Sequence, residues 1–148
     1  MLVFKEGRLY AGRSSFAIPD GFRVNDHPDV FLSNGIMLSM PDEAISVDVN
    51  FEYSENGAEE GLRESLAEFT TSKMKARAFD GGTGWCAESR GDLYAYLEVR
   101  FDAPTGITNA HGDPVNTFRV VATAPYATNI RALRKSPEMT GLLNNFRP

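Results

Sequence analysis

Hydrophobic and polar residues alternate strictly between Ile45 and Tyr53. A period of two places the two sets of side chains on opposite faces of a β-strand. The apolar set is Ile45, Val47, Val49, Phe51 and Tyr53, and the polar set is Ser46, Asp48, Asn50 and Glu52. Strands with one apolar and one polar face are typical of antiparallel sheets. The pattern therefore predicts a strand at the centre of an antiparallel sheet.

The period then changes to that of an amphipathic helix, which is predicted to run to Met74. Asn56 and Glu59 have the spacing of a capping box, in which both side chains satisfy free backbone N–H groups. An apolar stripe follows at Ala58, Leu62, Leu66 and Phe69. Acidic residues lie in the first half, and Lys73, Lys75 and Arg77 lie towards the other end. This order complements the helix dipole.

Shorter patterns complete an α+β plan. Strands are predicted over 8–11, 15–18, 22–24, 30–32 and 36–40 before the helix, and over 85–89, 93–101 and 118–122 after it. Turns are predicted at 19–21, 33–35 and 81–84, and short helices near 130–133 and from Pro137, with Ser136 as N-cap. The sequence thus predicts one domain over 1–148, an antiparallel β-sheet flanked by helices.

Composition and charge restrict the classes of partner. The chain has 148 residues, 42% of them hydrophobic, which is enough for one domain with its own core. The net charge is −5 and no run is rich in Lys or Arg, so we expect no nucleic-acid partner. No apolar run approaches the roughly 20 residues of a membrane span, and the start lacks the features of a signal peptide. We therefore expect no membrane partner and a cytoplasmic location.

Four segments, in this order, resemble the Mog1/PsbP-like superfamily. They are Ser15–Phe22 with its Phe-Ala-Ile-Pro-Asp-Gly-Phe run, Ile45–Tyr53, the helix with Glu68-Phe69, and Leu142–Phe146. The resemblance covers most of the chain and consists of order and pattern. It implies an α/β/α sandwich with a central antiparallel sheet.

The resemblance also implies a role. Members of the superfamily serve as extrinsic subunits of photosystem II, as a Ran-binding nuclear import factor, and as many bacterial proteins of unassigned role. Most are binding or accessory modules. The expectation is therefore a non-enzymatic accessory domain of bacterial origin that binds a protein and needs no cofactor. The chain lacks a targeting peptide and any matched Ran-binding motif, so neither specific role is carried over.

Two polar segments contain the histidines of the chain. One holds His27 and Asp29, and the other holds His111 and Asp113. Imidazole beside carboxylate suits Zn or Fe binding or proton transfer. Neither segment has a defined ligand spacing, and solvated turns have the same composition, so no metal site is predicted. The alternative function is a small metal-assisted hydrolase that uses His27 and His111.

A recognition face is the other candidate site. Tyr94, Tyr96 and Arg100 alternate along one predicted strand, and aromatic residues with Arg are enriched at binding hot spots. A helix packed on this face is the favoured explanation of the tyrosines, with each ring buried and its hydroxyl hydrogen-bonded. Cys86 has no neighbouring base and is typical of a small buried residue. A third hypothesis is self-association through an exposed strand edge, with an oligomeric state that the sequence leaves open.

Overall fold

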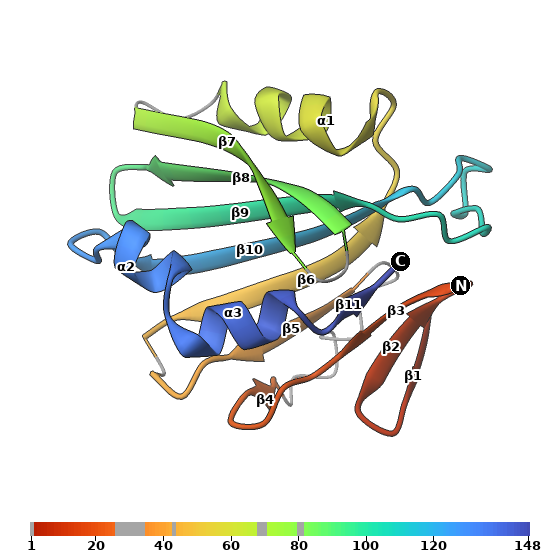
Figure 1. Ribbon diagram of the computed structural model, residues 1–148, viewed down its shortest axis with the longest axis horizontal. Coiled ribbons are helices and arrows are strands. Elements are labelled where there is room, and N and C mark those ends of the chain that lie inside the picture. Colours follow the sequence, from red (N-terminus) through yellow and green to blue (C-terminus); the bar gives the residue numbers. More distant parts are fainter. Residues whose placement is uncertain (1, 26–34, 43, 68–70, 80–81) are drawn as a thin grey trace.

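The computed structural model describes residues 2–25, 35–42, 44–67, 71–79 and 82–148. In these ranges the chain forms two antiparallel sheets and three helices (Figure 1). The first half contains β1 (Val3–Lys5), β2 (Arg8–Ala11), β3 (Ser14–Ala17), β4 (Arg23–Val24), β5 (Gly35–Ser39), β6 (Ser46–Glu52) and α1 (Gly57–Leu66). The second half contains β7 (Thr71–Phe79), β8 (Gly82–Arg90), β9 (Tyr94–Asp102), β10 (Thr117–Pro125), α2 (Ile130–Arg134), α3 (Pro137–Leu143) and β11 (Phe146–Arg147). The predicted α+β class is confirmed.

The larger sheet has the order β4-β5-β6-β10-β9-β8-β7, and each neighbouring pair is antiparallel. The strand predicted from strict alternation, β6, lies inside this sheet between β5 and β10. Its apolar residues Val47, Val49 and Phe51 are almost completely buried, as the alternation predicts.

The smaller sheet, β1-β2-β3-β11, joins the two ends of the chain. Both termini lie beside it in Figure 1. Phe16 of β3 and Phe146 of β11 pack on Phe118 of β10, with ring centroids 5.4 and 4.4 Å away. The sequence predicted strands over 8–11 and 15–18 but no second sheet, because the strands of this sheet have only two to four residues.

Helices cover both faces of the larger sheet. The cluster of buried apolar residues that includes Phe118 also contains Met139, Leu142 and Leu143 of α3. Helix α1 packs on β8 and β9 from the other face, where it meets Glu98 and Arg100. Ser136 accepts a hydrogen bond from the Met139 N–H and so caps α3, as predicted.

The prediction that the first helix continues to Met74 is wrong. Helix α1 ends at Leu66, and residues 71–79 form the strand β7. All nine of these residues pair with β8, from Thr71 opposite Arg90 to Phe79 opposite Gly82. Pairing with an adjacent strand thus overrides the helix preference of Lys, Met and Ala in this segment.

The predicted capping box is also wrong. Asn56 precedes α1 but makes no side-chain capping hydrogen bond. The Ala58 N–H instead donates to a carboxylate oxygen of Asp102, at the end of β9, over 3.1 Å. Glu59 pairs with Arg63 one turn along the helix, at 3.0 Å. A carboxylate distant in sequence therefore caps the helix.

Of two predicted turns, one is confirmed and the other is misplaced. The turn at Pro19–Gly21 is confirmed, since the Phe22 N–H donates to the Pro19 carbonyl and Gly21 has φ +89°. The turn at 81–84 is placed too late, because β8 already begins at Gly82. The predicted strand 30–32 and residues 33–34 of the Asn-Gly turn lie outside the described residues.

Candidate functional site

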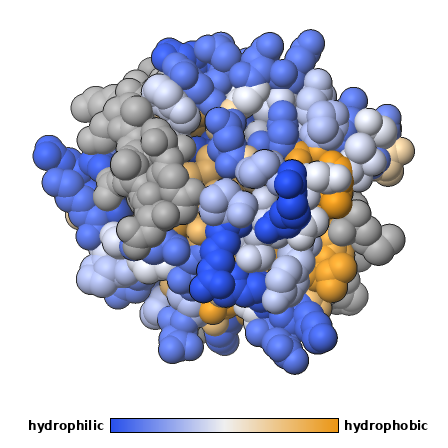
Figure 2. Space-filling model, turned by 45° about the vertical axis from the view of Figure 1, so that its right-hand side comes forward, coloured by the Kyte–Doolittle hydropathy of each residue, from blue (hydrophilic) through white to orange (hydrophobic). Residues whose placement is uncertain are grey.

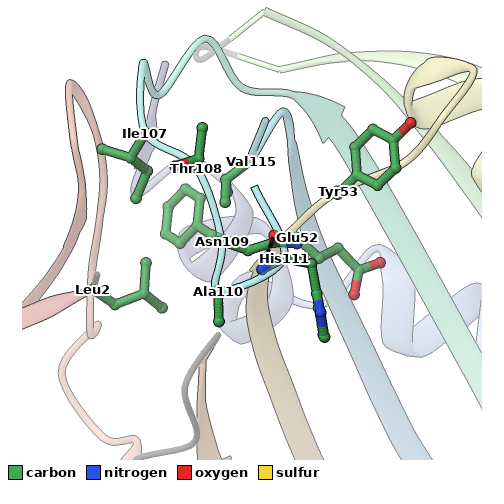
Figure 3. A pocket seen from close by; sticks show the side chains of 10 residues that line it. Leu2, Glu52, Tyr53, Ile107, Thr108, Asn109, Ala110, His111 and Val115 are labelled. Atoms are coloured by element: carbon green, nitrogen blue, oxygen red, sulfur yellow. Dashed lines mark hydrogen bonds between the residues drawn. The ribbon is translucent and has the colours of Figure 1, made fainter. Parts of the chain in front are cut away.

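A cavity of about 650 Å³ lies at the end of the larger sheet where the 103–116 loop joins β9 to β10. It is lined by Leu2, Phe51, Glu52, Tyr53, Ile107, Thr108, Asn109, Ala110, His111 and Val115. Figure 3 shows apolar side chains on one side and His111, Glu52 and Tyr53 on the other. Figure 2 turns this end of the molecule forward and shows small apolar areas between hydrophilic ones.

The apolar side of the cavity belongs to the core of the domain. Phe51 of β6 is 1% exposed and Val115 is 7% exposed. The Val115 N–H donates to the Ile107 carbonyl over 2.9 Å, and Thr108 forms a bridge with Pro114. These contacts fold the 103–116 loop back on itself beside Phe51. The floor is therefore fixed by the sheet.

The rim of the cavity is held by the Asn109 side chain. Its Oδ1 accepts from the backbone N–H groups of His111 and Asp113, at 2.9 and 3.0 Å. The Asn109 N–H donates to the Asp113 carbonyl over 2.9 Å. Gly112 completes this tight turn with φ +83°, a conformation that glycine adopts without strain. The polar rim is thus a defined structure.

The base of the loop is anchored to the smaller sheet. The Arg13 N–H donates to the Thr105 carbonyl over 2.9 Å, and the Thr105 hydroxyl donates to the Val115 carbonyl. Gly12 has φ +56°, and a Cβ there would lie 2.0 Å from the Thr105 oxygen. Glycine is therefore required where the loop meets the turn between β2 and β3.

An ion-pair cluster lies between the sheet and α1. Glu98 accepts from Arg100 Nε at 2.6 Å, from Arg119 at 3.1 Å and from the Ser65 hydroxyl at 3.0 Å. Arg100 also lies 3.2 Å from Glu52, and Arg119 lies 4.0 Å from it. Glu52 therefore belongs both to this cluster and to the cavity wall.

Burial and charge act in opposite directions on the carboxylates of this face. Burial raises the pKa of Glu98, but its hydrogen bonds and ion pairs with Arg119 and Arg100 outweigh that effect and hold the pKa below its usual value. Burial raises the pKa of Asp48, which the charge of Arg119 offsets only in part. Glu98 is thus stabilised in its charged form, whereas Asp48 carries a net penalty for charge.

The residues predicted as binding residues lie in different parts of the structure. His111 lines the cavity, and Asp113 shares its turn. Arg100 is 7% exposed beneath α1 and belongs to the ion-pair cluster. His27 and Asp29 lie outside the described residues. In the described part of the chain, no group of three His, Cys, Asp or Glu side chains could hold a metal ion.

The tyrosines of the predicted recognition face lie towards the opposite end of the sheet. Tyr94 is 48% exposed and is paired in the sheet with Pro125. Leu93 and Tyr126 beside it are 74% and 52% exposed, and the Arg90 guanidinium lies 5.3 Å from the Tyr126 ring. Tyr96 is half-buried. The helix expected as an alternative covers Arg100, and Tyr94 remains exposed.

Sequence reasoning missed most of the cavity wall. Phe51 was predicted as part of the apolar face of a strand, and His111 and Asp113 as candidate residues of a polar segment, without a connection between them. The one local signal was Asn109-Ala-His111-Gly-Asp113, because Asn often hydrogen-bonds to the backbone two residues on. Phe51 lies beside the loop because β6 pairs with β10. This pairing places Glu52 opposite Thr117, the residue that follows the loop.

None of the helices in the described ranges has the length and apolar character needed to cross a membrane. No protein-family model and no curated protein matches the sequence. Among solved structures, the fold is similar to the solution structure of cyanobacterial PsbP (CyanoP) from Synechocystis sp. PCC 6803. The TM-score is 0.46 with 12% sequence identity, over 91% of this chain and 86% of that chain.

Proposed function

We propose that this chain is a non-enzymatic accessory domain that binds a segment of a protein partner in the cavity beside the 103–116 loop. The observation that carries the proposal is the cavity itself, about 650 Å³ with a floor on Phe51 and Val115. Small-molecule pockets typically measure about 300–1,000 Å³ and combine an apolar lining with a few placed polar groups, and a pocket for the anchor side chain of a protein segment needs the same combination. This cavity has both properties.

The rigidity of the rim supports binding of this kind. The hydrogen bonds of Asn109 and Thr105 hold the loop in one conformation without a ligand. A site that is already ordered loses less conformational entropy when a partner binds. Burial of one apolar side chain contributes about 1.5–3 kcal/mol, so a bound segment also needs hydrogen bonds to the polar rim.

Two alanines provide a matched test. Ala110 is exposed and lines the cavity, whereas Ala127 is exposed beyond β10, at the opposite end of the sheet. Ala110→Arg places a long cation at the cavity, and Ala127→Arg adds the same charge elsewhere. Each tagged variant is used to capture proteins from the source cell, with quantification against the wild type.

The proposal requires one or more partners that the wild type and Ala127→Arg capture equally and that Ala110→Arg captures at least about tenfold less. Circular dichroism and thermal unfolding establish that both variants are folded. If every captured protein is retained by Ala110→Arg, or lost equally from both variants, the cavity is not the binding site.

A further inference from the structure

The geometry points to the C-terminal carboxylate of the partner, attached to a terminal apolar residue, as the group that this cavity recognises. The inference rests on the proposed function and specifies the partner segment. A terminal residue carries its side chain and its carboxylate on one Cα atom. It therefore needs an apolar surface and hydrogen-bond donors side by side, which is the arrangement around Asn109 (Figure 3).

The donors begin with the amide group of Asn109. Its oxygen is fixed towards the loop because it accepts from two backbone N–H groups, those of His111 and Asp113. The NH2 group is bonded to the same carbon and must point away from them, so the two ends of the amide cannot exchange without losing both bonds. Within the described residues this NH2 group donates no hydrogen bond. It is an oriented donor at the cavity wall.

Two further donors lie next to Asn109 in the wall. The Thr108 hydroxyl and the His111 imidazole both belong to cavity-lining residues, and both side chains are exposed. A carboxylate has two oxygens and accepts several hydrogen bonds, and such bonds are stronger than those between neutral groups. These residues add donors to the same cavity wall as the Asn109 NH2 group.

The acidic residue of the wall does not oppose this assignment. Glu52 is held by Arg100 at 3.2 Å and lies 4.0 Å from Arg119. The same two arginines also pair with Glu98, so they compensate the negative charge of Glu52 in part and weaken its repulsion of an anionic group in the cavity.

The apolar half determines which terminal side chain fits. Leu2 and Ile107 are half-buried at its edge, while Phe51 and Val115 form its floor. Branched aliphatic side chains such as leucine are complementary to this lining because they bury apolar area without a polar group to satisfy. The exposed Ala110 and Thr108 leave the mouth open for the preceding residues of the partner.

The test uses a fluorescein-labelled pentapeptide, Gly-Ser-Gly-Ser-Leu, with a free C-terminal carboxylate or with a carboxamide. Fluorescence anisotropy measures the affinity of each for the full chain. The wild type is expected to bind the free acid at least about tenfold more tightly than the amide, because charge-assisted hydrogen bonds are lost in the amide.

Asn109→Asp is the decisive variant. The new carboxylate retains the oxygen that accepts from His111 and Asp113, and it replaces the NH2 donor by a second, negatively charged oxygen. The preference for the free acid is expected to disappear or to invert. Asn129→Asp is the control, because Asn129 likewise accepts a backbone N–H, that of Ala132, far from the cavity. It should bind both peptides as the wild type does.

Three results overturn the inference. Equal binding of acid and amide by the wild type, or no binding of either, excludes recognition of the carboxylate. An unchanged preference in Asn109→Asp excludes Asn109 as the donor. Loss of the preference in Asn129→Asp as well as in Asn109→Asp indicates an effect of added negative charge and not of the Asn109 donor. In each case, capture of a protein that depends on Ala110 would leave the proposed function standing with a different anchor.

Discussion

Glutamine in place of Glu98 removes one charge from the ion-pair cluster beneath α1 and changes the shape of the side chain very little. The carboxylate is 7% exposed and accepts three hydrogen bonds, from Ser65, Arg100 and Arg119. In the variant, an amide NH2 group faces an arginine donor, and the buried Arg100 and the half-buried Arg119 share Glu52 as their remaining carboxylate within 4.0 Å. The substitution therefore breaks buried ion pairs rather than exposed ones.

The expected loss is about 3 kcal/mol of unfolding free energy. Removing one partner of a buried ion pair costs about 3–5 kcal/mol, and the lower end applies because Glu52 still compensates both arginines. For a chain of this size, that loss lowers Tm by about 6–12 °C. Urea unfolding at pH 7, followed by circular dichroism, measures the loss. Glu59→Gln is the control, since its partner Arg63 is 54% exposed and the pair contributes less than about 0.5 kcal/mol.

The pH dependence of the stability difference between wild type and Glu98→Gln provides a second measurement. The arginines hold the pKa of Glu98 below its unfolded value of about 4.3. The stabilisation is therefore complete above that value and is lost as the pH falls through the folded pKa. The difference between wild type and Glu98→Gln should be full at pH 7 and should shrink below about pH 4. A loss under about 1 kcal/mol at pH 7, or a difference that persists unchanged at pH 3, would refute the ion-pair reasoning.

Three further substitutions test other parts of the scaffold by urea unfolding. Gly61→Ala places a Cβ 2.6 Å from a guanidinium nitrogen of Arg100, so we expect a loss of about 1–3 kcal/mol despite the better helix propensity of alanine. A stabilised variant would contradict close packing at this site. Asp102→Ala removes the acceptor of the Ala58 N–H and should cost about 1 kcal/mol, and an unchanged midpoint would show that the cap contributes nothing. Asp48→Asn should increase stability at pH 7, because burial raises the pKa of Asp48, and the gain should vanish below about pH 3.9. A loss at pH 7 would contradict this sign.

The strand β6 could be predicted from the sequence because its pattern and its surroundings agree. Val47, Val49 and Phe51 face a single core, so one period describes the whole element. At β7 the local preferences and the surroundings disagree, and the prediction from the sequence was wrong. Lys73-Met74-Lys75-Ala76-Arg77-Ala78 also alternates with a period of two, but each residue favours helices, and the segment directly follows a true helix. The strand forms because β8 pairs with it. This pairing cannot be inferred from the helix preferences of the residues in the segment.

The candidate site depends still more on distant contacts. Phe51 and Asn109 are separated by more than fifty residues, and the register between β6 and β10 brings their segments together. The sequence predicted His111 and Asp113 as candidate residues of one polar segment. It could not predict that the Asn109 oxygen is used by the loop, or that Arg100 would pair with Glu98 and Glu52.

The scaffold and the site are joined at Glu52. A carboxylate in a binding cavity would ordinarily repel an anionic ligand, but here Arg100 and Arg119 approach it from the other side. Those arginines are in turn positioned by Glu98, which α1 contacts through Ser65. Neighbouring residues of a strand point to opposite faces of the sheet. Phe51 therefore belongs to the apolar floor of the cavity, whereas the next residue, Glu52, belongs to the charged layer on the other face. Helix α1 therefore contributes to the electrostatics of a cavity that it does not line.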